Sequence, residues 1–215
     1  MKPVGYQTAL IGKWHLGDGP GYHPLDRGFD EFFGFLGAAN AFLTTHTPGG
    51  RSVPLGYPID PIPEKRSFLM YRGRNVIEEH RYLTDAFAAE ATAFIERTHG
   101  QPFLLYLAFN AVHRPLHTTD RYWDRFDGIK DERHRALAAM TSSLDFAVDA
   151  VLAKLREHKL DRDTMVVFLS DNGCPAKERA GTNAPLSGEK CTYYEGGVRV
   201  PFAAMWPGRI PAGKV

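Results

Sequence analysis

The chain has 215 residues, of which 43% are hydrophobic and 12% aromatic, so it can bury a sizeable core in one domain or a large part of one. Twenty-six Lys and Arg balance twenty-five Asp and Glu, which leaves a net charge of +1. This balance excludes a bulk field that attracts nucleic acid or anionic lipid, so any anion specificity must be local. No apolar stretch approaches the roughly 20 residues of a membrane span, and nothing near Met1 reads as a signal peptide.

Both ends of the chain look cut. The strand-like run 5–12 has no cap or turn before it, and the chain stops soon after another strand-like run at 200–206. The two cysteines, Cys174 and Cys191, are too few for a disulfide framework, although their spacing permits one bridge between them. The cysteine content therefore does not indicate whether the protein occupies an oxidising or a reducing compartment.

The sequence of the first half predicts a strand at 5–12, a long irregular segment and then a helix. Residues 42–74 are rich in Pro, Gly and Arg and lack periodicity, which predicts an irregular surface segment. Thr84 can cap the helix, with Asp85 near the positive helix end, and Gly100 closes it. Its apolar positions share one face, and they are Phe87, Ala91, Phe94 and Ile95.

The second half continues the alternation of strands and helices. The continuous apolar run 103–109 predicts a central strand covered on both faces. A stripe at helical spacing predicts a long second helix, and its members are Leu137, Met140, Leu144, Val148, Val151, Leu152 and Leu155. The run 165–169 predicts another buried strand, which ends in polar residues 170–173. The organisation is therefore α/β, and ligands of open α/β sheets bind beyond the carboxyl ends of strands.

Lys13 and His15 stand two residues apart at the end of the first predicted strand, between Gly12 and Gly17. Residues two apart in an extended chain point to the same side, so this pair can clamp an oxyanion. A solvated lysine beside a structural histidine gives the same pattern, and the segment alone does not separate the two interpretations.

His113 follows the predicted strand 103–109, at a strand end where a general acid is useful. A histidine in a loop is also often structural, and the nearby His117 has no stronger claim.

Asp171 and Asn172 offer a carboxylate and an amide oxygen side by side, the hard donors that Ca²⁺ or Mg²⁺ prefers. Zinc favours His or Cys, and an Asp-Asn-Gly run is also a common turn. Lys190 lies in a loop that leads to paired glycines, Gly196 and Gly197, and alone it carries no clear meaning.

Together, these four segments resemble the formylglycine-dependent sulfatase family, which is arylsulfatase-like and part of the alkaline phosphatase superfamily. The pattern Gly-Tyr-x-Thr at 5–8, followed by Gly-Lys-Trp-His-Leu-Gly at 12–17, is similar to one of the family's two signatures. The other three segments occur in the family's order, and the resemblance covers residues 5–208, least well over 42–74. It implies an alkaline-phosphatase-like α/β sandwich, with a largely parallel central sheet flanked by helices and incomplete at both ends. Residues 1–215 would then be part of a sulfatase catalytic domain.

The resemblance also implies a role for each candidate side chain. Lys13 and Lys190 would bind the sulfate oxygens and stabilise charge in the transition state. His15 would contact the hydrated aldehyde nucleophile and assist its regeneration. His113 would lie by the ester oxygen and help the leaving group depart.

Asp171 and Asn172 would bind one calcium ion, as part of its ligand set. The family's formylglycine comes from a cysteine in a Cys-x-Pro-x-Arg type motif, and neither Cys174 nor Cys191 lies in such a motif. Glu189 and Cys191 flank Lys190 where glycines are common in the family. We therefore expect a sulfuric ester hydrolase whose nucleophile lies outside this chain, so that the chain alone is inactive.

Two alternatives stay open at this stage. A phosphodiester or phosphonate monoester hydrolase of the same superfamily handles a similar tetrahedral anion, and a fragment that only binds anions needs no nucleophile. The expected partner is a small-molecule or carbohydrate sulfate ester, with no nucleic acid and no membrane span. The family suggests an exported protein, in the periplasm, the extracellular space or the lysosome.

Overall fold

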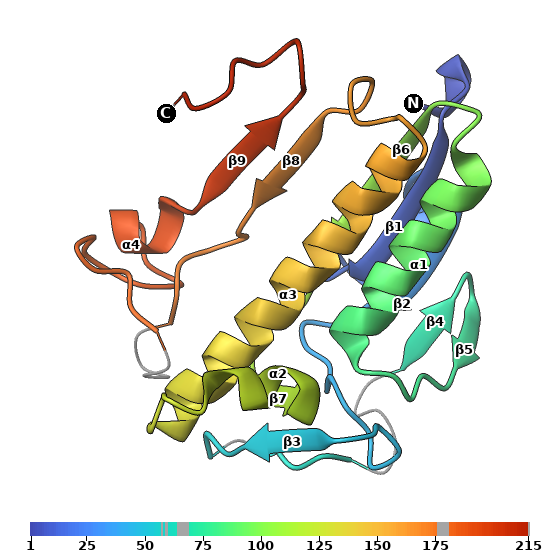
Figure 1. Cartoon of the computed structure of the whole chain (residues 1–215). Helices are drawn as coiled ribbons and strands as arrows, with labels where there is room; N and C mark the ends of the chain where they lie inside the picture. The colour runs from blue at the N-terminus through green and yellow to red at the C-terminus, as the bar shows by residue number, and fades with distance from the viewer. Residues whose placement is uncertain (57, 59, 64–68, 176–180, 215) are drawn as a thin grey trace. The chain divides into compact units, whose positions relative to one another are not determined.

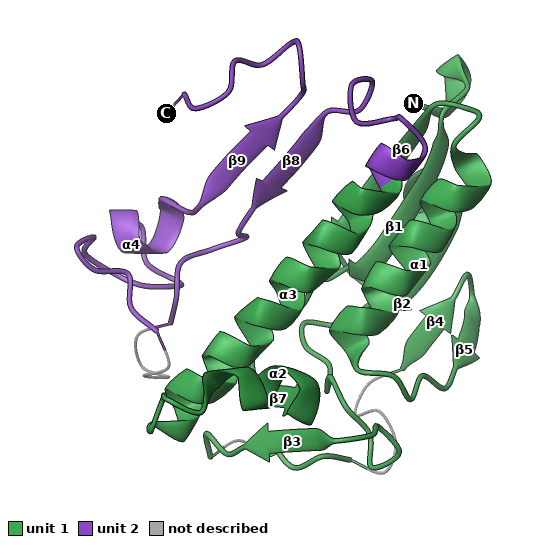
Figure 2. Ribbon diagram, in the orientation of Figure 1, with its two compact units in different colours: residues 1–154 green, residues 155–215 purple. Residues whose placement is uncertain are grey.

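The computed structural model describes residues 1–56, 58, 60–63, 69–175 and 181–214. The chain divides into two compact units, Met1–Lys154 and Leu155–Val215, which Figure 2 shows in different colours.

The first unit is built on a five-stranded sheet in the order β5-β4-β2-β1-β6 (Figure 1). Strand β1 (Gln7–Lys13) lies between β2 (Glu31–Phe35) and β6 (Phe103–Ala108) and runs parallel to both. Strands β4 (Met70–Arg72) and β5 (Asn75–Ile77) extend the sheet in antiparallel fashion. The sheet is therefore mixed, and its parallel part is the part that carries candidate site residues.

Helix α1 (Leu83–Thr98) packs on strands β1, β2 and β6 of this sheet. The four residues predicted to form its apolar face, Phe87, Ala91, Phe94 and Ile95, are completely buried. The Phe87 ring meets Phe33 edge-on, with centroids 6.0 Å apart, which ties the helix to β2. Because side chains alternate along a strand, the opposite face of the sheet buries a second cluster, made of Leu10, Trp14 and Phe32.

The start of α1 differs from the prediction. The helix begins at Leu83, with Tyr82 as its N-cap residue, and Thr84 is fully buried inside the first turn, so Thr84 is not the cap. Asp85 lies in the first turn as predicted. Its Oδ1 accepts a hydrogen bond of 2.6 Å from the Tyr122 hydroxyl, and burial raises the pKa of Asp85 above its ordinary value.

Strand β6 is not the central strand predicted from its apolar run. It lies at the edge of the described sheet, and Leu104 and Tyr106 are 38% and 50% exposed. A continuous apolar run shows that a strand is apolar on both faces, but it does not show how many layers cover it.

The segment 42–74 also differs from the irregular surface excursion expected. Phe42 and Leu43 are completely buried, and strand β3 (Gly50–Val53) pairs with β7 (Leu116–Thr119) in a second, antiparallel sheet. Buried anchors without a regular period do not produce a helix or strand pattern in the sequence. Residues 57, 59 and 64–68 of this segment lie outside the described residues.

Helix α3 (Glu132–Glu157) is the long second helix predicted. Small residues dominate its buried positions, which include Ala136, Ala139, Met140, Ser143 and Ala147. By length and composition alone, an 18-residue window of this helix, with mean hydropathy 1.4, qualifies as a candidate membrane span, contrary to the expectation of no such stretch. One such helix is weak evidence for a span, because core helices of soluble proteins meet the same criterion.

The remaining elements of the first unit are short. They are the 3₁₀ turns η1 (Lys2–Val4), η2 (Pro24–Arg27) and η3 (Asp124–Phe126), and helix α2 (Asp120–Trp123).

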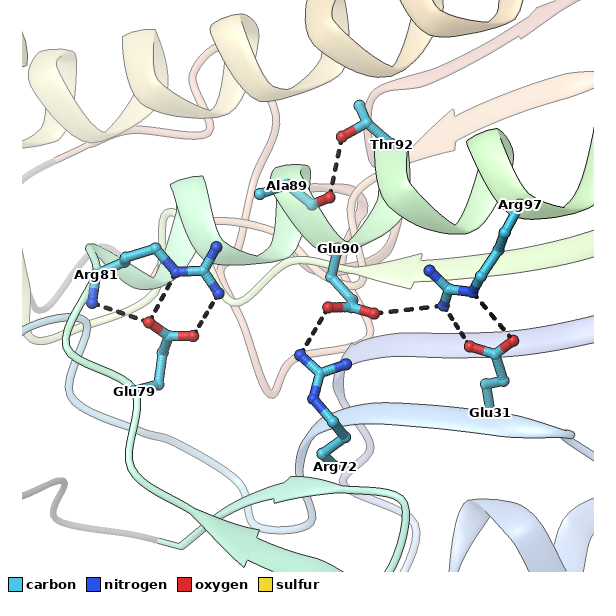
Figure 3. Close-up of polar contacts among 8 residues, drawn as sticks. All are labelled: Glu31, Arg72, Glu79, Arg81, Ala89, Glu90, Thr92 and Arg97. Atoms are coloured by element: carbon cyan, nitrogen blue, oxygen red, sulfur yellow. Dashed lines mark hydrogen bonds and ion pairs between the residues drawn. The ribbon is translucent and has the colours of Figure 1, made fainter.

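Ion pairs connect one side of α1 to strands of the sheet (Figure 3). Glu90, whose side chain is 12% exposed, pairs with Arg72 of β4 at 2.8 Å and with Arg97 at 3.4 Å. Arg97 also pairs with Glu31, the first residue of β2. Burial alone would raise the pKa of Glu90, but the two arginines outweigh it and hold the pKa below its ordinary value of 4.5.

The second unit contains an antiparallel pair, β8 (Val166–Leu169) and β9 (Phe202–Met205), and one helical turn, α4 (Glu195–Val198). The buried strand predicted at 165–169 is therefore a strand, but Phe168 and Leu169 are 43% and 56% exposed. Its strand partner in the described chain is β9, whose residues are all exposed.

Candidate functional site

In the first unit, two glycines fix the backbone that carries Lys13. Gly12 lies opposite Gly34 on one side and Ala108 on the other. A Cβ on Gly12 would overlap the Ala108 carbonyl oxygen, and φ of Gly12 is +116°, a conformation that favours glycine. A Cβ on Gly34 would overlap the Gly12 carbonyl oxygen in the same way. Lys13 therefore follows a point where three strands approach closely, and its side chain is half-buried.

The pairing with β2 continues past the end of β1. The amides of Trp14 and His15 each donate a 3.0 Å bond, to the carbonyls of Phe35 and Leu36. The Trp14 ring is buried, and its Nε1 donates to the Tyr22 carbonyl at 2.8 Å. His15 adopts φ +54°, and its side chain is exposed. The buried tryptophan therefore anchors the segment between two candidate site residues.

His113 lies in the loop after β6, and hydrogen bonds hold both its backbone and its ring. Its amide donates to the Asn110 carbonyl at 2.8 Å, and its Nδ1 lies 2.8 Å from the Arg114 carbonyl oxygen. Because a carbonyl only accepts, Nδ1 carries the proton of this bond. Nε2 is then the ring nitrogen that can exchange a proton with a substrate.

His117 has a structural role instead. It lies completely buried in β7, and its Nε2 is 2.7 Å from the Asp60 carbonyl oxygen. The Tyr82 hydroxyl donates to the His117 carbonyl at 3.0 Å, and burial raises the pKa of Tyr82 to about 12. The tyrosine therefore stays a neutral donor.

In the second unit, Asp171 and Asn172 follow β8 directly. The Ser170 amide donates to the Pro201 carbonyl at 3.1 Å, which extends the pairing of β8 with β9 up to this turn. The Asn172 Nδ2 donates to the Gly173 carbonyl at 3.2 Å, so the amide oxygen is the atom that can face a cation. Asp171 is exposed and Asn172 half-buried.

Lys190 belongs to the same hydrogen-bonded group of loops as this pair. Its amide lies 3.5 Å from the Cys174 carbonyl oxygen, and the Gly173 amide donates to the Gly197 carbonyl at 3.0 Å. A Cβ on Gly173 would overlap the Gly196 carbonyl oxygen. The absence of a side chain at Gly173 therefore lets the two loops approach backbone to backbone, while Gly196 and Gly197 let the loop of Lys190 fold closely on itself.

No disulfide joins Cys174 and Cys191 in the described part of the chain. Cys191 is exposed and adopts φ +70°, the left-handed region that favours glycine. Of the run that begins at Cys174, residues 176–180 lie outside the described residues.

The sequence pattern did not reveal Asn183, whose side chain joins the loop of Asp171 to the loop of Lys190 through three backbone hydrogen bonds. Its only signal in the sequence is an asparagine near a proline, which is typical of any turn.

The candidate residues thus form two groups. Lys13 and His113 follow parallel neighbouring strands, and so they lie beyond the carboxyl ends of these strands, on the same side of the first unit's sheet. Asp171, Asn172 and Lys190 lie in connected loops of the second unit. The first group consists of a lysine and a histidine, and the second of a carboxylate, a carboxamide and a lysine.

Comparison with known proteins identifies the fold to which this mixed α/β sheet belongs. The crystal structure of Ps i-CgsB in complex with k-i-k-neocarrahexaose matches with a TM-score of 0.82 and 32% identity, over 99% of this chain and 47% of that one. The PsFucS1 sulfatase from Pseudoalteromonas sp. matches with a TM-score of 0.73 and 26% identity, over 99% of this chain and 45% of that one. These matches confirm the alkaline-phosphatase-like α/β fold class predicted from the sequence.

The sulfatase family model matches residues 1–215, and the chain belongs to the sulfatase family. N-acetylgalactosamine-6-sulfatase of Canis lupus familiaris is 33% identical over 228 residues, and arylsulfatase G of Rattus norvegicus is 33% identical over 240 residues. The alignments cover 100% and 98% of this chain, but 40% and 44% of those two proteins. The chain therefore spans less than half the length of these relatives. Members of the family generally use a formylglycine and a divalent metal.

Proposed function

We propose that the protein containing this chain hydrolyses sulfate esters, and that the chain supplies sulfate-binding and cation-binding residues but not the nucleophile. One observation carries the proposal: in a chain that matches the sulfatase family throughout, Lys13 and His113 follow parallel neighbouring strands and reach the same sheet edge. Neither Cys174 nor Cys191 lies in the motif that yields formylglycine.

Lys13 and Lys190 bind the sulfate oxygens in this proposal. Sulfate transfer concentrates negative charge on these oxygens, and a fixed ammonium group stabilises that charge as an oxyanion hole does. The close approach of β1, β2 and β6 at Gly12 supports the role of Lys13, because it fixes the backbone from which the side chain extends.

In its protonated imidazolium form, His113 donates the proton of Nε2 to the departing ester oxygen and keeps the proton of Nδ1. The bond from Nδ1 to the Arg114 carbonyl supports this role, because it sets the orientation of the ring and assigns Nδ1 to the backbone. His15 would contact the formylglycine supplied by the rest of the protein and would accept a proton there. Its exposed ring, held by a paired backbone, is consistent with contact to a group from elsewhere in the protein.

Asp171 and Asn172 hold a calcium ion, as two of its ligands. Both offer oxygen, and Asn172 directs its Nδ2 to a backbone carbonyl, so the donor set fits a hard cation better than zinc. When bound, such an ion acts as a Lewis acid and as a template for the reacting groups.

The substrate in this proposal is a carbohydrate sulfate ester. Two similarities support this substrate class. The chain is 32% identical to Ps i-CgsB, which was solved in complex with k-i-k-neocarrahexaose, and it is related to N-acetylgalactosamine-6-sulfatase. We also propose that the protein is exported.

The test uses the parent protein, meaning this chain together with its nucleophile segment. Turnover of sulfated oligosaccharides should fall by about 100-fold or more in Lys13→Ala and in Lys190→Ala, as loss of an oxyanion donor does. The exposed Lys130→Ala is the matched control and should behave as wild type. Wild-type kinetics in Lys13→Ala would show that the segment 12–17 is structural, and a preference for phosphodiesters would favour the other hydrolase class.

The choice of metal has its own test. Elemental analysis of the purified parent protein should find calcium, and a calcium chelator should abolish activity. Stoichiometric zinc, with activity that survives removal of calcium, would contradict the assignment of Asp171 and Asn172.

A further inference from the structure

The side chain of Asn183 bridges two loops of the second unit. Its Oδ1 accepts from the Cys174 amide at 2.7 Å, and its Nδ2 donates to the Cys174 carbonyl at 2.7 Å. The same Nδ2 donates to the Gly188 carbonyl at 3.2 Å. One carboxamide therefore pairs with the segment after Asp171 and Asn172 and also with the segment before Lys190.

Backbone contacts between the same loops surround this bridge. The Gly173 amide donates to the Gly197 carbonyl at 3.0 Å, and a Cβ on Gly173 would overlap the Gly196 carbonyl oxygen. These contacts leave little room for one loop to move without the other.

The Cys174 carbonyl is the point at which the two candidate functions meet. It accepts the 2.7 Å bond from Asn183 and lies 3.5 Å from the Lys190 amide. The bond to Asn183 is much the shorter, so Asn183 sets the position of this carbonyl more strongly than Lys190 does. A shift of the turn that carries Asp171 is therefore transmitted to the backbone of Lys190.

We propose that Asn183 is a positioning residue that couples cation binding at Asp171 and Asn172 to sulfate binding at Lys190. This inference rests on the proposed function of those residues. Coupling between two sites is reciprocal, so loss of the bridge lowers the affinity of the protein for both the cation and sulfate. Outer partners of metal ligands typically contribute about 10-fold or more to metal affinity.

Only a carboxamide of this length satisfies the three bonds. Aspartate keeps an acceptor for the Cys174 amide but places a carboxylate oxygen against the carbonyls of Cys174 and Gly188. Asn183→Asp is therefore a second variant of nearly unchanged size, beside Asn183→Ala. Asn75→Ala, at an exposed position of β5, is the matched control.

The experiment measures the dissociation constants of Ca²⁺ and of inorganic sulfate by calorimetry, in the parent protein and in its variants. Both Asn183 variants should raise the dissociation constant of Ca²⁺ by about 10-fold or more, and the dissociation constant of sulfate should rise as well. Asn75→Ala should change neither constant. In the Lys190→Ala background, Asn183→Ala should cause little further loss of sulfate affinity, because the residue through which it acts is gone.

Two results would overturn the inference alone. They are Asn183 variants that bind both ligands within twofold of wild type, and a loss of sulfate affinity that is equally large with and without Lys190. A wild-type protein that binds neither Ca²⁺ nor sulfate would overturn the proposed function, and the inference with it.

Discussion

The two units hold their candidate site residues in different ways. Lys13 and His113 follow strands of a sheet with a fully buried core, in which residues such as Leu10 and Phe87 have no exposed surface. Asp171 and Lys190 lie in loops beside a strand pair that is largely exposed, and Asn183 with neighbouring glycines joins them. The first arrangement depends on packing and the second on hydrogen bonds to the backbone, so substitutions should act on them differently.

The largest effect should come from Gly12→Ala. The new Cβ would overlap the Ala108 carbonyl, in a backbone conformation with positive φ, so the free energy of unfolding should fall by about 3 kcal/mol or more. Urea denaturation followed by circular dichroism measures this change.

Gly100→Ala is the control for that substitution, since nothing lies within 4 Å of the position that its new Cβ would take and its φ is not left-handed. It should change stability by less than about 1 kcal/mol. Equal effects of the two substitutions would show that the close approach of β1 and β6 does not matter.

An intermediate effect is expected for Glu90→Gln. The arginines hold the pKa of Glu90 below 4.5, so its charge contributes stability above the unfolded pKa that is lost as pH falls through the folded pKa. At pH 7 the variant should be less stable by about 1–2 kcal/mol, because the partly exposed Arg72 weakens the pair. Denaturation at pH 7 and at stepwise lower pH should show the difference shrinking below pH 4.5.

Glu195→Gln is the matched control in the second unit, where the pair with Arg199 at 3.4 Å is exposed on both sides. It should have no measurable effect on stability. A difference for Glu90→Gln that does not depend on pH would show that packing, and not charge, is responsible.

The smallest effect should come from Cys191→Gly, and it should be stabilising. Glycine relieves the positive φ at this position, and we expect a gain of about 0.5–1 kcal/mol. The φ angle of Cys174, a described residue, is not positive, so Cys174→Gly should lower stability instead. Thermal denaturation of both variants compares them, and the same sign for both would contradict this account.

The sequence predicted most of the first unit because its signals are local. The apolar face of α1 and the strand 5–12 follow from periodicity, and the Lys13 segment follows from a family pattern. The position of β6 at the sheet edge and the exposure of β8 could not be predicted, since an apolar run does not reveal the layers around it.

The role of Asn183 could not be predicted for a different reason. A side chain that binds the backbone of Cys174 and Gly188 leaves no periodic trace, and its partners are ordinary backbone groups. The buried anchors Phe42 and Leu43 were missed because proline and glycine surround them without a regular period.

The most direct test of the central claim is an assay of residues Met1–Val215 alone. Sulfate-ester cleavage needs an activated nucleophile behind sulfur, and neither Cys174 nor Cys191 lies in the required motif. Purified monomer should therefore not turn over a chromogenic aryl sulfate with calcium present. Multiple turnover that disappears in Lys13→Ala would contradict the account, because a contaminating enzyme would not respond to that substitution.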